Sequence, residues 1–139
     1  MRVLRSFLAI LAGLVVLTLV AETIEVAIFA ALHGEFTQDP AVYFGVRNRP
    51  GVLVAKLFYN SGAAFLAGYV AAWVAGRAAL LHGAVLAVIQ LSLFVWGMMY
   101  SEYAGTTPTW AWVALVPLMG IGILLGARSR GAKPALPIR

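Results

Sequence analysis

The sequence predicts an all-α membrane protein, a four-transmembrane-helix bundle with both termini in the cytoplasm. Of its 139 residues, 63% are hydrophobic and 11% are charged, whereas soluble domains have about 45–50% and about 25%. A chain this short has a large surface for its volume, so a water-soluble fold could not bury that much apolar surface. Four apolar runs each approach the roughly 20 residues that cross about 30 Å of hydrocarbon. We therefore expect residues 1–139 to form a single integral membrane domain.

The first apolar run covers residues 6–32 and is interrupted by Glu22 and Glu25. The two arginines before it, together with the apolar residues that follow them, also match a secretory signal peptide. Residues 19–21 make a poor cleavage site, however, and the apolar pattern continues beyond them. The sequence therefore favours an uncleaved first span.

The second and third apolar runs, residues 52–75 and 79–99, are separated only by Gly76, Arg77 and Ala78. So short a connection predicts a tight antiparallel hairpin of two spans. One long continuous helix is the alternative. It would place Arg77 deep in lipid, where a charge costs about 2.5–3.5 kcal/mol, so we expect the hairpin.

The fourth run covers residues 110–127 and contains Pro117, which removes a backbone hydrogen bond and predicts a kink. A basic tail, residues 128–139, follows it. The one long connection between spans is residues 34–51, and residues 41–46 within it fit a short interfacial helix.

Basic residues in the short segments between the spans determine the orientation, because cytoplasmic segments carry the excess of lysine and arginine. Six lie on the side of the termini and two on the side of the long connection: Arg2, Arg5, Arg77, Arg128, Arg130 and Lys133 against Arg47 and Arg49. This places both termini inside. Aromatic residues collect at the outer level, as in an interfacial belt: Phe36, Tyr43, Phe44, Tyr100, Tyr103, Trp110 and Trp112.

Polar side chains of the first two spans are expected to meet near the outer boundary. By helical phase, Thr18, Glu22 and Glu25 lie on one stripe of the first span, which Phe29 and His33 extend. Helix rise puts the second span's basic and amide groups at a matching depth. The predicted polar cluster, a possible binding site, is Glu22, Glu25, His33, Lys56, Tyr59 and Asn60.

One lysine between two glutamates leaves an excess of negative charge in this cluster. Arg47, Arg49 or His33 could compensate it, or one glutamate could hold a proton, because neighbouring carboxylates raise each other's pKa. Charges this close to the interface can reach water, so the sequence favours a structural role. A binding or translocation site is the alternative, since ion-coupled transporters use carboxylates that gain and lose a proton.

No catalytic signature accompanies the cluster. The chain has no cysteine, and no spacing of histidine and glutamate resembles a zinc site. We therefore expect no catalytic residue, no metal and no cofactor.

Interhelical contacts are predicted from small and polar residues within the spans. Thr18 and Gln90 are expected to form hydrogen bonds across helices. Small residues recur every four positions on the second and fourth spans, a spacing that lets helices approach closely. We favour packing inside the bundle over a dimer seam for these residues: Ala64, Gly68, Ala72, Gly122 and Gly126.

The stretch 68–83, with Gly68-Tyr69 near the end of the second span, the Arg77 turn and His82-Gly83 in the third, resembles a loose group of small uncharacterised bacterial four-helix inner-membrane proteins. The resemblance implies a multi-pass protein of the bacterial inner membrane and assigns no functional residue. The small multidrug resistance transporters also have four helices and a first-span glutamate. Here, however, the glutamates lie near the outer end and the first connection is long.

The sequence favours a non-enzymatic accessory or assembly subunit of a membrane complex. A small ion-coupled transporter that uses Glu22 and Glu25 is the alternative, and an enzyme comes third. The expected partners are the lipid bilayer and either another membrane protein or a second copy of the chain. The net charge of +5 is gathered at the ends of the spans, which argues against nucleic acid.

Overall fold

The computed structural model describes residues 2–35 and 37–131. In this part of the chain there are five α-helices, one 3₁₀ turn and no strand: α1 (Arg2–His33), α2 (Pro40–Arg47), α3 (Pro50–Ala75), α4 (Ala79–Tyr100), η1 (Ala104–Thr106) and α5 (Thr109–Gly131). Four of the helices are long and apolar enough to cross a membrane. The predicted all-helical architecture with four candidate spans is confirmed, and α2 occupies the place predicted for the short helix.

The helices extend beyond the apolar runs at both ends of the chain. α1 begins at Arg2, before residue 6, and α5 continues to Gly131, past residue 127. Arg128 and Arg130 fall in the last turn of α5, where positive charge favours the helix dipole. The rest of the basic tail, including Lys133, lies outside the described residues, as does Phe36 of the predicted aromatic belt.

The break between α3 and α4 is sharp. Gly76 has a positive φ of 70°, and its amide donates to the Ala72 carbonyl at 3.0 Å, which ends α3. Ala78 also has a positive φ, 45°, and α4 begins at the next residue. From α1, Arg5 donates through Nε to the Val74 carbonyl at 2.7 Å, near the negative end of α3. The chain therefore forms a hairpin here, not one continuous helix.

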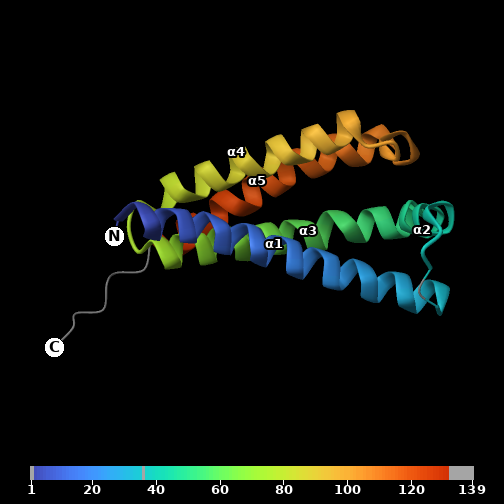
Figure 1. Ribbon diagram of the computed structural model, residues 1–139, viewed down its shortest axis with the longest axis horizontal. Coiled ribbons are helices and arrows are strands. Elements are labelled where there is room, and N and C mark those ends of the chain that lie inside the picture. The colour runs from blue at the N-terminus through green and yellow to red at the C-terminus, as the bar shows by residue number, and fades with distance from the viewer. Residues whose placement is uncertain (1, 36, 132–139) are drawn as a thin grey trace.

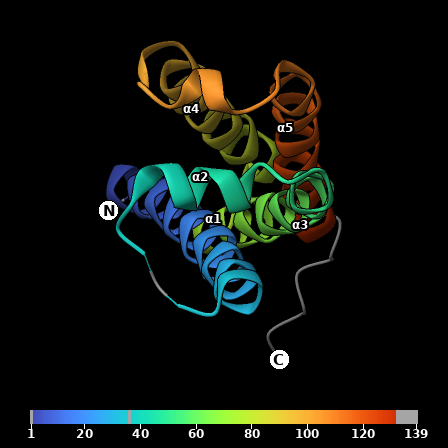
Figure 2. The same cartoon turned by 90° about the vertical axis from the view of Figure 1, so that its right-hand side faces the viewer.

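The long helices form two layers, α1 with α3 and α4 with α5, and α3 also packs closely on α5 (Figure 1). The amino terminus, the α3–α4 turn and the end of α5 lie at one end of the bundle, which we call the basic end. The layers diverge toward the other end, the polar end, where α2 crosses the ends of α1 and α3 (Figure 2).

Glycines on α3 and α5 allow these two helices to touch through their backbones. A Cβ added at Gly68 would overlap the backbone of Ile123, and one added at Gly126 would overlap the Phe65 carbonyl oxygen. A Cβ at Gly122 would lie 2.9 Å from the Ser61 carbonyl oxygen. Ala64 and Ala72 are buried on α3 as well. The structure thus places the predicted small residues inside the bundle.

Every fourth residue of α1 is buried, from Ala9 to Phe29, and this stripe faces the interior of the bundle. Its members are Ala9, Gly13, Leu17, Ala21, Glu25 and Phe29. Because four residues turn a helix by about 400°, the buried face rotates by about 40° at each step. This rotation brings Glu25 into the interior at the polar end.

Candidate functional site

Glu25 is the centre of the polar network at the polar end of the bundle. Only 5% of the residue is exposed, and its carboxylate lies between α1, α2 and α3. A buried charge needs partners, because moving an ionised group out of water costs several kcal/mol unless ion pairs and hydrogen bonds replace its hydration. The surroundings of Glu25 supply four.

Two partners reach each carboxylate oxygen. The Tyr43 hydroxyl donates to Oε1 at 2.9 Å, and Arg47 Nε lies 2.6 Å from the same oxygen. Lys56 Nζ donates to Oε2 at 2.6 Å, and the Tyr59 hydroxyl donates to it at 2.7 Å. Two donors on each oxygen use the capacity of the ionised carboxylate. Glu25 is therefore a saturated acceptor that ties α2 and α3 to α1.

The short helix α2 delivers two of these partners. Asp39 caps it by accepting a hydrogen bond from the Ala41 amide at 2.8 Å, and Pro40 occupies its first turn. Tyr43 and Arg47 are one turn apart, so they point to the same side. Val46 on α2 is buried, with 4% exposed, and anchors the helix on the bundle.

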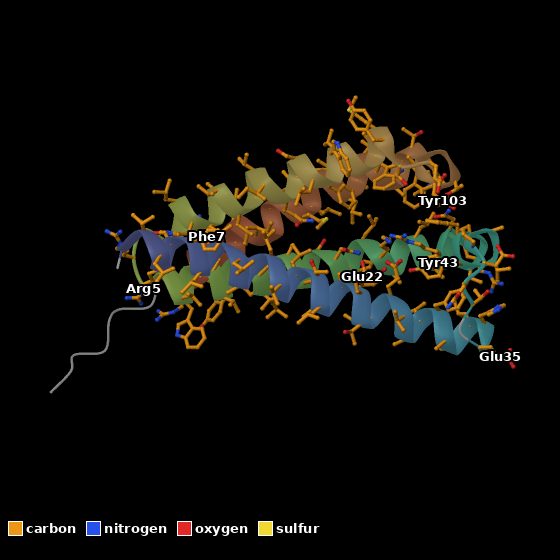
Figure 3. The ribbon with its side chains drawn as sticks, in the orientation of Figure 1. Arg5, Phe7, Glu22, Glu35, Tyr43 and Tyr103 are labelled. Atoms are coloured by element: carbon orange, nitrogen blue, oxygen red, sulfur yellow. The ribbon has the colours of Figure 1, made fainter. Side chains whose placement is uncertain are left out.

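Asn48, which follows α2, connects the network to the α4–α5 connection. Its amide nitrogen donates to the Thr106 carbonyl at 2.9 Å, and its amide oxygen accepts from the Thr107 hydroxyl at 3.0 Å. The rings of Phe44 and Tyr103 stack beside these bonds at 4.8 Å between centroids. These contacts hold the polar end together across both layers. Tyr43 and Tyr103, labelled in Figure 3, both lie at this end.

Tyr43 shows the effect of the carboxylate on a neighbour outside the spans. Burial raises the pKa of its hydroxyl to about 12, and the charge of Glu25 and the hydrogen bond to it act in the same direction. The neutral hydroxyl therefore remains a donor to Glu25 at every physiological pH.

The structure separates the predicted polar cluster into buried and exposed residues, because the buried face of α1 rotates along the helix. Glu25 and Lys56 are buried and Tyr59 is half-buried, but Glu22, Thr18 and His33 are exposed. The charge of Glu22 still acts on Tyr43, so Glu22 departs from the expectation in its burial and in having no direct bond to the network. Two cations, the buried Lys56 and the half-buried Arg47, pair with the one carboxylate of Glu25, so the ion-paired groups carry an excess of positive charge instead of the expected negative charge.

Three further predicted residues lie apart from the carboxylate. Asn60 is buried but donates to the Lys56 carbonyl of its own helix at 3.0 Å. His33 packs on the ring of Phe29, with 5.2 Å between centroids. Gln90 is half-buried on α4 and makes no hydrogen bond to another described side chain or backbone group, so the expected bond across helices is absent in this part of the chain.

Tyr43 is the member of the network that sequence reasoning missed. It was assigned to the aromatic belt by its position near the boundary. The available signal was its spacing of four residues from Arg47 on a predicted interfacial helix, since Arg47 was already a candidate partner of the glutamates.

Beside the network lies a cavity of about 30 Å³ between α3, α4 and α5. Its polar lining residues are Arg47, Asn48, Lys56, Thr107 and Trp112. Trp112 Nε1 is buried and has no hydrogen-bond partner in residues 2–35 and 37–131. A cavity this size holds about one water molecule, which the indole could bind as donor. It is too small for a substrate.

The described residues contain no group of three histidine, aspartate or glutamate side chains that could hold a metal ion. No protein-family model, curated protein or solved structure matches the chain. The geometry of the Glu25 network and of the surface around it is therefore the basis for assigning a function.

Proposed function

We propose that the protein is an accessory or assembly subunit of a bacterial inner-membrane complex, with both termini cytoplasmic and no catalytic centre of its own. Its partner is a transmembrane helix, from another protein or from a second copy of the chain. The helix packs on the face of α1 that carries Thr18 and Glu22.

One observation supports this most directly: Glu22 and Thr18 are exposed although they lie within a candidate span. They are one turn apart on α1 and so share a face. A carboxylate that faces hydrocarbon is costly, and such groups almost always face a protein partner or a water-filled space. A partner helix with a basic or hydrogen-bond-donating residue at this depth would satisfy both side chains.

The saturation of Glu25 supports a structural role for the neighbouring network. A proton-carrying carboxylate must exchange its partners for water during transport. Glu25 has four donors from two other helices, which occupy the acceptor sites that water would need. Glu22 is left as the carboxylate through which the alternative, ion-coupled transport, would operate.

Photo-crosslinking from α1 tests the proposal. Val15 is 47% exposed and shares the face of Thr18 and Glu22, so a photoreactive amino acid there leaves both polar groups intact. Val88, 66% exposed on α4, is the matched control. We expect one protein adduct of defined mass from position 15 and none from position 88. The adduct should disappear in the Thr18→Val/Glu22→Leu variant.

Adducts with lipid alone at both positions would contradict the proposal. A proton-driven uptake of solute by reconstituted vesicles, abolished by Glu22→Gln, would favour the transporter instead.

A further inference from the structure

The basic end of the bundle contains a second cavity, of about 570 Å³, between the α3–α4 turn and the end of α5. Arg77 from the turn and Arg128 and Arg130 from α5 line it. The first turn of α4 forms another part of the wall, with Leu80 and Leu81. The cavity is therefore basic on one side and apolar on the other.

No acidic side chain of the chain is near these arginines. The five acidic residues are Glu22, Glu25, Glu35, Asp39 and Glu102, and all belong to helix segments or connections in the polar half of the bundle (Figure 1). Within the described residues, the three arginines make no ion pair and no side-chain hydrogen bond. Arg5, by contrast, donates to the end of α3. Within the described residues the chain supplies no counter-charge for these three cations, so they are available to bind an anion.

The chemistry of the walls indicates which anion fits. Guanidinium groups form paired hydrogen bonds with phosphate oxygens, and three around one cavity suit a phosphate group. Leu80 and Leu81 are 54% and 63% exposed beside the basic wall. A small soluble anion has no apolar group that could pack on these leucines. An amphiphile places its charged group against the arginines and its hydrocarbon along the leucines.

We propose that this cavity binds the phosphate headgroup of an anionic phospholipid, with an acyl chain along the first turns of α4. Basic pockets between transmembrane helices at the cytoplasmic boundary bind such headgroups in other membrane proteins. The bound lipid would bridge α3, α4 and α5 at the end of the bundle opposite the Glu25 network.

Native mass spectrometry of the purified chain in mild detergent tests this. Phosphatidylglycerol, phosphatidylcholine and soluble glycerol 3-phosphate are titrated separately against three proteins. These are the wild type, the Arg128→Gln/Arg130→Gln variant and the control Arg49→Gln, an exposed arginine at the polar end. Arg77 is kept in all of them, so that the positive charge of the turn still orients the spans.

We expect the wild type and the control to retain phosphatidylglycerol more tightly than phosphatidylcholine. Each arginine near a lipid surface contributes about five-fold in affinity, so the double variant should bind phosphatidylglycerol roughly 25-fold more weakly. An Arg128→Lys/Arg130→Lys variant, which keeps the charge, should recover part of the binding.

Two results would overturn the proposal. Equal retention of phosphatidylglycerol by the wild type and the double variant would mean that the arginines do not hold the headgroup. Binding of glycerol 3-phosphate as tight as that of the lipid, with the same dependence on the arginines, would make the occupant a soluble phosphate compound.

Discussion

Glu25→Gln is expected to destabilise the protein by about 3–5 kcal/mol, because it leaves the buried Lys56 and the half-buried Arg47 without a counter-charge. The amide also replaces one acceptor oxygen with a donor that faces other donors. Glu22→Gln is the matched control three residues away on the same helix. Since Glu22 is exposed and makes no hydrogen bond or ion pair with the described residues, we expect it to leave the free energy of unfolding within about 0.5 kcal/mol of the wild type.

Unfolding of the detergent-solubilised variants, followed by tryptophan fluorescence, measures both effects. The Glu25→Gln/Lys56→Met variant adds a sharper test, because it removes one of the stranded cations. It should be more stable than the sum of the two single changes predicts, since groups in contact couple by about 0.5–3 kcal/mol. Strict additivity, or equal effects of Glu22→Gln and Glu25→Gln, would refute the network.

Gly126→Ala is expected to push α3 and α5 apart. Its loss of stability should be comparable to that of Glu25→Gln. The new methyl group would overlap the Phe65 carbonyl oxygen, which is backbone and cannot rotate away. Inserting a methyl group into a well-packed contact costs about 1–3 kcal/mol. Here the cost should reach or exceed the upper end of that range, because the backbone cannot move aside. Gly68→Ala, which meets the backbone of Ile123 from the other helix, should behave alike.

Gly62→Ala provides the control on α3 itself. A Cβ at Gly62 would meet no atom within 4 Å, so alanine should be neutral or stabilise the helix by up to about 1 kcal/mol. Thermal unfolding of the three variants in the same detergent separates the cases. Wild-type stability of Gly126→Ala would mean that the two helices do not pack through this glycine.

The spans could be predicted from the sequence because hydrophobic length is a local property. The break at Gly76 was also readable, since a glycine and a charged arginine between two apolar runs favour a turn over a continuous span. The ends of the helices were harder to predict from the sequence. The helix α5 continues through Arg128 and Arg130 because no residue there interrupts helical geometry. A hydropathy boundary marks where lipid ends, and a helix can continue beyond it.

The site was predicted in part. Lys56 and Tyr59 were expected near the glutamates, and the structure joins them to Glu25. The separation of Glu25 from Glu22 depends on how α1 crosses α3, which rotates the buried face along the helix. The role of Tyr43 depends on where α2 lies across the bundle. Both are tertiary features that helical phase and depth within single helices do not contain.

The proposed membrane role requires four helices that cross the membrane with the Glu25 network at the outer face. Cysteine labelling in spheroplasts tests this directly, because the chain has no cysteine of its own. Gln38→Cys lies in the exposed connection before α2, and Ser129→Cys lies in the exposed last turn of α5. A membrane-impermeant thiol reagent should label Gln38→Cys at once and Ser129→Cys only after the membrane is permeabilised. Labelling of Ser129→Cys but not of Gln38→Cys in intact spheroplasts would contradict the orientation and the outward position of the network.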